Sequence, residues 1–345
     1  VMASDIVLLD IFNTLGLPTS TTVSMVFELL GGTVAIALIK TFGDTAINAG
    51  ELMNTSKALT MIMAIFVSVA IAFAVGTFVQ YISRLIFTFT YNNKALKWKI
   101  GIFGGIAFTA IVYFMLIKGV GNFSFMTADA KAWMNTHQWT ICGICFVTFA
   151  IVSQILYFLK ISVFKVLVLA GTFALAMAFA GNDLVNFIGV PLAGFASYTD
   201  FMANGNGDYA GFMMDSLNGP AKTPVLFLVA AGTVMVISLA TSKKAFNVVK
   251  TSVDLARQDA GDEMFGSSKM ARILVRFSTN TAAGISELVP DRVKRWVNAR
   301  FNNENVVLPR GAAFDEIRAT VNLVVSSLLI ALGTSLTLPL STTYV

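Results

Sequence analysis

Long apolar runs recur along this chain, and they limit its fold more than any other feature. Residues 20–39, 139–159 and 223–241 are three of these runs, and Glu28 is the only charged residue in them. A helix needs about 20 mostly apolar residues to cross the hydrocarbon core of a bilayer. The other runs cover residues 1–16, 58–90, 100–118, 161–180, the shorter 184–198, and 318–338. The pattern predicts an all-α, polytopic bundle of membrane-spanning helices.

The composition agrees with a membrane protein and argues against a soluble one. Only 12% of the 345 residues are charged and 56% are apolar, whereas a soluble domain has about 25% charged residues. The mean hydropathy is +0.75. The net charge of +5 suits lipid headgroups and cytoplasmic loops better than nucleic acid. We therefore expect a multi-pass integral membrane protein of a bacterial inner or other plasma membrane, with membrane lipid and no nucleic acid among its partners.

Residues 242–317 differ from the rest of the chain because they hold twelve of its 24 lysines and arginines. Apolar residues recur there at helical spacing in two sets: Phe246, Val249, Val253 and Ala256, then Met270, Ile273, Leu274 and Phe277. Basic amphipathic helices usually lie along a membrane surface, and the positive-inside rule places them in the cytoplasm. We expect a cytoplasmic connecting segment between the transmembrane helices of 1–241 and a further hairpin in 318–345; a separate regulatory domain is the alternative.

One short motif occurs twice, at opposite ends of the chain. Residues 17–22 read L-P-T-S-T-T and residues 338–343 read L-P-L-S-T-T, a pattern expected by chance roughly once per million positions. Proline ends one helix and starts the next, and the serine and threonines cap the new helix. The free N–H groups and positive dipole end of such a helix suit an anion. Internal repeats and interrupted helices mark the binding sites of secondary transporters, although a proline-kinked turn between two spans is the simpler alternative.

A third polar element interrupts the apolar sequence at residues 181–186, G-N-D-L-V-N. Asn182 and Asn186 share one helical face, and Asp183 lies beside them. These side chains are costly in lipid, so we expect them to face a cavity. Glycines at 181 and 189 permit local unwinding that frees carbonyl oxygens, and such oxygens with the side chains suit a hard cation such as Na⁺. A helix-ending turn at the membrane surface is the alternative.

Together these motifs resemble the inorganic phosphate transporter (PiT) family. Its members carry two inverted repeats, each with a G-x-N-D-x-x-N motif on a broken helix and a P-x-S-T-T motif at the tip of a re-entrant hairpin. Residues 285–290, I-S-E-L-V-P, also resemble the family's approach to its second hairpin. The resemblance implies phosphate ligands at Ser20, Thr21, Thr22, Ser341, Thr342 and Thr343, and Na⁺ ligands at Asn182, Asp183 and Asn186.

The sequence departs from the family in three ways that leave the ion and the substrate open. Val23 and Tyr344 follow the S-T-T triplets where members often have histidine, and Val190 separates Gly189 from Pro191. The first N-D-x-x-N element is absent. We expect the chain to be truncated at both ends, running from the second part of repeat one to the start of the second hairpin, with another N-D-x-x-N element before Val1.

Other polar residues in apolar surroundings are secondary candidates. Asp5, Asp10 and Glu28 are acids in apolar runs, and we rank Glu28 first. His137 is expected to be an interfacial surface residue, and Cys142 and Cys145 small apolar residues of a membrane helix. Gly101 and Gly105 have the spacing of close helix packing.

The sequence lacks the motifs of the common enzyme classes. It has no G-x-x-x-x-G-K-[ST] loop, and one histidine without clustered thiols supports neither a zinc site nor a Ser-His-Asp triad. We expect no enzyme activity, no catalytic residue, and no cofactor or metal beyond a coupling Na⁺. The expected function is phosphate transport coupled to Na⁺ or H⁺ by alternating access. A sulfate permease of the same fold and a non-transporting membrane scaffold are the alternatives, and a homo-oligomer stays open.

Overall fold

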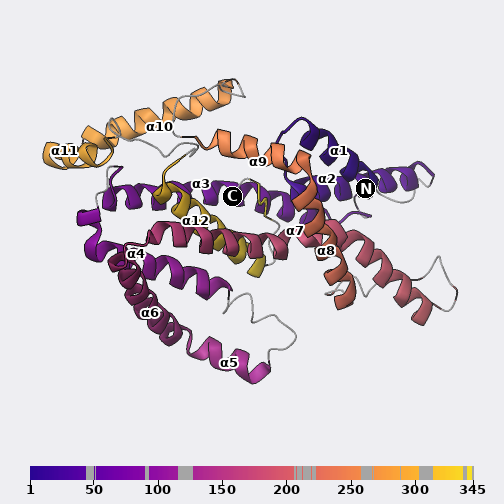
Figure 1. The fold of residues 1–345 in the computed structure, drawn as a ribbon. Helices are drawn as coiled ribbons and strands as arrows, with labels where there is room; N and C mark the ends of the chain where they lie inside the picture. Colours follow the sequence, from indigo (N-terminus) through magenta and orange to yellow (C-terminus); the bar gives the residue numbers. More distant parts are fainter. Residues whose placement is uncertain are drawn as a thin grey trace. The chain divides into compact units, whose positions relative to one another are not determined.

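The computed structural model describes residues 1–43, 50, 52–89, 93–115, 127–205, 207, 212, 219, 223–257, 266, 268–287, 289–302, 314–336 and 340–343. Its regular structure is helical throughout the described residues (Figure 1). In chain order the helices are α1 (Met2–Thr14), α2 (Thr21–Gly43), α3 (Thr55–Ile86), α4 (Asn93–Val112), α5 (Ala128–Thr136), α6 (Gln138–Phe158), α7 (Val163–Asn204), α8 (Val225–Thr241), α9 (Lys243–Leu255), α10 (Lys269–Glu287), α11 (Asp291–Arg300) and α12 (Glu316–Ser335).

Six of the described helices are long and apolar enough to cross a membrane, or seven if the bent pair α8–α9 is one span. The candidate spans are Thr21–Phe42, Thr55–Ile86, Trp98–Met115, Gln138–Phe158, Val163–Asn204 and Glu316–Ser335. The prediction of an all-α, polytopic bundle is confirmed. The protein is an integral, multi-pass membrane protein.

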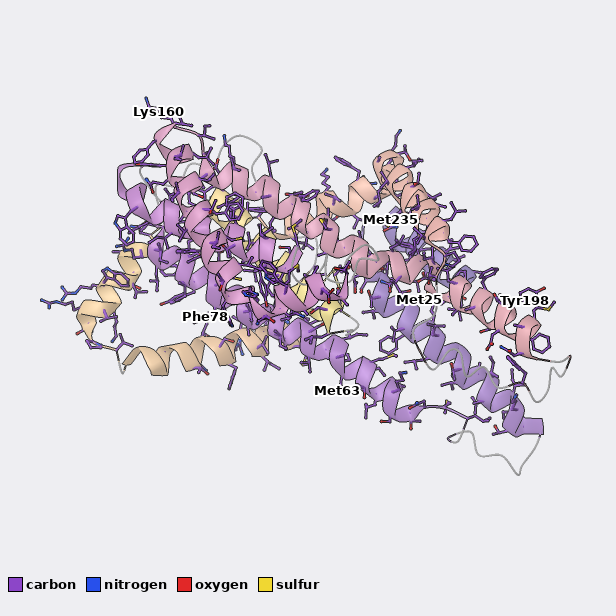
Figure 2. All side chains as sticks on the ribbon, turned by 90° about the horizontal axis from the view of Figure 1, so that it is seen from below. Met25, Met63, Phe78, Lys160, Tyr198 and Met235 are labelled. Atoms are coloured by element: carbon purple, nitrogen blue, oxygen red, sulfur yellow. The ribbon has the colours of Figure 1, made fainter. Side chains whose placement is uncertain are left out.

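Apolar side chains on these helices point outward as well as inward. On α3, Met63 is 53% exposed and Phe78 is 65% exposed, and Figure 2 shows their side chains extending from the ribbon. Lipid is as apolar as these side chains, so a spanning helix gains nothing by burying them all. The outward apolar surface is what lipid-facing helices require.

The chain divides into two compact units. The first unit comprises residues 1–73, 173–251 and 327–345, and the second comprises residues 74–172 and 252–326. In the first unit, α1 and α2 form a helical hairpin whose tip is residues 15–20. Residues Met2–Thr14 of the first arm form about 20 Å of helix.

In the second unit α4 packs tightly against α6, where glycines allow the two backbones to approach. A Cβ added to Gly101 or Gly105 would fall within 3.2 Å of Ala150 atoms, and one at Gly104 would overlap Ser153. The close packing predicted from Gly101 and Gly105 is confirmed. Any larger residue on this face of α4 would force the two helices apart.

An aromatic cluster and an ion pair complete the second unit. The ring of Phe87 lies 5.0 Å from that of Phe103 and 5.6 Å from that of Phe164. Arg84, 3% exposed at the end of α3, pairs with Asp315 at 2.5 Å, just before α12. A charge buried this deeply needs its partner, so this pair holds the end of α3 beside the start of α12.

One expectation from the sequence is wrong, because α7 is a single helix. The run 161–180 and the shorter 184–198 were expected to be separate elements with unwound backbone near residue 181, but α7 continues for 42 residues from Val163 to Asn204, with Pro191 inside it. Glycine and asparagine cost only about 1 kcal/mol each in a helix. The long apolar sequence on both sides favours helix, so the helix continues through these glycine and asparagine residues.

The basic segment forms amphipathic helices, as its periodicity predicts. The axis turns by 71° between α8 and α9. Phe246 on α9 is 69% exposed, and Met270 and Phe277 on α10 are 79% and 70% exposed. Each helix therefore presents an apolar face to its surroundings, the arrangement of helices that lie on a membrane.

Candidate functional site at the two hairpin tips

The first hairpin tip is shaped by three local features. Gly16 has φ +67°, a conformation that favours glycine, and Pro18 lies in the break between α1 and α2 as predicted. The Ser20 hydroxyl accepts a hydrogen bond from the Val23 N–H at 3.2 Å, so Ser20 caps α2. The N–H groups of Thr21 and Thr22 precede the first intrahelical bonds and remain at the positive end of the helix.

Two amides of α7 contact the threonines of this tip. The Asn186 side chain donates to Thr22 Oγ1 at 2.8 Å and approaches Thr21 Oγ1 at 3.5 Å, and Asn182 reaches Thr22 Oγ1 at 3.4 Å. The i, i+4 spacing of the asparagines places both on the face of α7 that meets α2. Thr22 is 4% exposed, whereas Asn182 and Asn186 are half-buried.

The second tip reaches the same place from the other end of the chain. The Thr342 hydroxyl donates to Asp183, 3.2 Å from Oδ1 and 3.3 Å from Oδ2. The Thr343 hydroxyl donates to the backbone carbonyl of Thr19 at 2.9 Å. All of these residues belong to the first unit. The two copies of the motif, more than 300 residues apart in sequence, thus touch each other and the N-D-x-x-N element.

The cluster is polar and half-buried: Ser20, Thr22 and Ser341 are buried, whereas Asp183 and both asparagines are partly exposed. Asp183 also accepts from the Asn182 amide at 3.1 Å. Ser341 is fully buried, and within the described residues its hydroxyl has no hydrogen-bond partner. No lysine or arginine contributes to these hydrogen bonds in the part of the chain that the structure describes. An anion here would be held by hydroxyls and backbone N–H groups, and Asp183 would require a cation or a proton nearby.

The predicted phosphate and Na⁺ ligands therefore form one cluster rather than two sites. Thr21, Thr22 and Thr342 contact the asparagines and Asp183 directly. Ser20 is committed to its cap, and Thr343 faces Thr19 rather than Asp183. Thr342 and Thr343 form a turn, and Pro339 lies outside the described residues, as do the last two residues of the chain.

Two parts of the site were not predicted from the sequence. Thr19 takes part through its backbone carbonyl, which its side-chain identity does not reveal. Helix α9 packs on the same tip: a Cβ on Gly16 would lie 3.5 Å from Thr251 Oγ1, and Lys244 pairs with Asp10 of α1 at 2.6 Å. The only sequence signal for this contact is the polar face of α9, opposite its exposed apolar face.

The three acids of the first hairpin have different surroundings. Asp10 is 61% exposed and ion-paired, whereas Asp5 is 4% exposed and its Oδ1 has no hydrogen-bond partner in the described residues. Glu28, with Ser20 and Ser24, lines a pocket of about 360 Å³ between α1 and α2. Its Oε2 is also buried without a partner among the residues described. Because Asp5 is buried, it is a stronger functional candidate than its place in the sequence indicates, and it ranks close to Glu28.

Three further residues match their expected structural surroundings. His137 is exposed and stacks on Trp133 with ring centroids 4.9 Å apart. Cys142 and Cys145 are free thiols in α6. Within the described ranges, no group of three or more histidine, cysteine, aspartate or glutamate side chains is arranged to hold a metal ion.

Comparison with known proteins adds nothing to this geometry. The sequence matches no protein-family model, no curated protein and no solved structure. The function must therefore be inferred from the site itself.

Proposed function

We propose that this protein is a secondary transporter that carries inorganic phosphate across a bacterial inner or other plasma membrane, coupled to Na⁺ or H⁺. The observation that carries the proposal is the meeting of both S-T-T triplets at the N-D-x-x-N element of α7, through Thr22 and Thr342. Two repeated tips, the first of which starts a helix, around half-buried oxygen ligands resemble the arrangement of a substrate site in secondary transporters.

The chemistry of the cluster fits a phosphate ion and a cation bound side by side. Backbone N–H groups at the start of α2 and the hydroxyls of Thr21 and Thr22 are donors for the anion. Asp183, Asn182 and Asn186 supply oxygen ligands for Na⁺. The cation offsets the repulsion between Asp183 and the anion, which makes joint binding stronger than binding of either ion alone. The phosphate is moved unchanged, so in this proposal the protein is not an enzyme and needs no cofactor.

The proposal is tested by uptake of labelled phosphate into vesicles that contain the protein expressed from its complete gene. Thr22→Val and Thr342→Val each remove one hydroxyl from the cluster. Because a hydrogen bond to a charged group is worth about 1.5–3 kcal/mol, each should reduce phosphate uptake at low concentration about tenfold or more. Thr233→Val is the control, since in the described part of the chain the Thr233 hydroxyl bonds only to the Val229 carbonyl of its own helix, at 2.8 Å.

The same vesicles separate the alternative functions. Sulfate uptake that exceeds phosphate uptake would make the protein a sulfate permease of this fold. A proton gradient that replaces Na⁺ would change the coupling ion. Vesicles that take up neither anion, with protein correctly inserted, would favour a scaffold. Equal uptake by Thr22→Val and Thr233→Val would contradict the proposed site.

A further inference from the structure

A second cavity lies in the second unit, and none of the residues that line it belongs to the hairpin tips. It has a volume of about 370 Å³ and is formed by the end of α3, the start of α4 and the end of α11. The volume falls within the range of small-molecule sites, about 300–1,000 Å³. Its walls are apolar and aromatic apart from two basic residues, Lys99 and Arg300.

The cavity lies at the end of two candidate spans, where the headgroup region of a bilayer begins. The span Thr55–Ile86 contributes its last residues, and the span Trp98–Met115 contributes its first. Trp98 and Trp296, both in the cavity wall, are 66% and 49% exposed. Tryptophan is enriched at the membrane–water interface, so both side chains indicate that the cavity lies at the depth of the lipid headgroups.

Among the residues that the structure describes, the two basic side chains have no acidic partner. Arg300 lies over the ring of Trp296, with its guanidinium carbon 5.3 Å from the ring centroid. In the part of the chain that the structure describes, neither Lys99 nor Arg300 forms an ion pair, and no acid lines the cavity. Two cations above an apolar wall favour an occupant that is anionic at one end and apolar at the other.

The apolar wall continues from the basic residues into the span. Ile102 and Ile106 follow Trp98 by one and two helical turns on the same face of α4 and are 42% and 58% exposed. Stacking of Tyr81 on Phe301, with centroids 5.1 Å apart, fixes the end of α11 against α3. Helix α10, which precedes α11, has exposed apolar residues that indicate contact with lipid.

We propose that this cavity binds an anionic phospholipid, with an acyl chain along Ile102 and Ile106 and the phosphate between Lys99 and Arg300. Free phosphate does not fit the same walls, because a hydrated anion loses water there without gaining enough donors. Basic pockets at the ends of membrane helices bind anionic headgroups in this way. The inference does not rest on phosphate transport.

The test measures lipid retention by the detergent-purified protein with native mass spectrometry. Phosphatidylglycerol and phosphatidylcholine with identical chains are compared. Each basic residue near a membrane surface is worth about 1 kcal/mol, so Lys99→Gln and Arg300→Gln should each weaken phosphatidylglycerol binding about fivefold. Arg292→Gln is the matched control, because Arg292 is an exposed residue of the same helix outside the cavity.

A second variant tests the apolar part without changing charge. Ile102→Trp fills the wall and should reduce retention of both lipids while leaving Lys99 and Arg300 in place. Competition by inorganic phosphate should be negligible. The proposal is overturned if Arg292→Gln weakens binding as much as Arg300→Gln, if Ile102→Trp has no effect, or if inorganic phosphate displaces the lipid.

Discussion

At the scale of single residues, Asp183 has the most demanding environment in the proposed site. Its carboxylate accepts from Thr342 and Asn182, and an anion bound beside it would repel it. We favour the role of Na⁺ ligand, because Asn182 and Asn186 provide neighbouring oxygens of the right kind. The alternative is that Asp183 accepts a hydrogen bond from protonated phosphate.

Substitution of Asp183 by asparagine distinguishes these roles. As a Na⁺ ligand, Asp183→Asn should raise the Na⁺ concentration for half-maximal uptake about 10- to 100-fold, since a charged contact is worth about 1.5–3 kcal/mol. The ratio of phosphate to sulfate uptake should not change. A relaxed ratio would assign Asp183 to the anion instead. Unchanged Na⁺ dependence and an unchanged ratio would remove it from the site.

Gly16 tests the shape of the first tip. Its φ of +67° and its closeness to Thr251 leave little tolerance for a side chain. Because a left-handed conformation costs an L-residue about 1–2 kcal/mol, Gly16→Ala should lower the thermal unfolding midpoint in detergent. Gly31→Ala is the control, since nothing lies within 4 Å of a Cβ there and α2 is helical; it should raise the midpoint slightly. Equal effects of the two substitutions would argue against the tip conformation.

At the scale of elements, the continuity of α7 decides how the N-D-x-x-N element is presented. Spin labels at exposed Phe173 and Tyr198, both in the first unit, bracket Gly181 and Pro191. A straight helix places these positions about 37 Å apart, at 1.5 Å per residue. Double electron–electron resonance should give a single distance between the two spin labels near this value. A main population at about 30 Å or less would show that the helix breaks.

At the scale of the whole molecule, hydropathy and sequence motifs predicted the spans and most of the site residues, but not the continuity of α7 or the role of Thr19. The run 20–39 became the span Thr21–Phe42, because a bilayer leaves helices as the way to satisfy backbone groups. The motifs located Thr22, Asn186 and Asp183, since unusual polar residues in apolar sequence are costly. The glycine at 181 predicted an unwound backbone, but the flanking apolar sequence keeps α7 intact there. The side chain of Thr19 gave no signal for its contact, because it is the backbone carbonyl that accepts the hydrogen bond from Thr343.

The central claim is that the two hairpin tips close on one site, and a disulfide tests it most directly. The Thr343 hydroxyl lies 2.9 Å from the Thr19 carbonyl, so cysteines at these two positions lie near bridging range. The pair Thr19→Cys and Thr343→Cys, with Cys142 and Cys145 changed to serine, should cross-link on oxidation. Uptake of phosphate should then stop and return on reduction. Absence of a cross-link, or full uptake by cross-linked protein, would contradict a site that opens and closes between these tips.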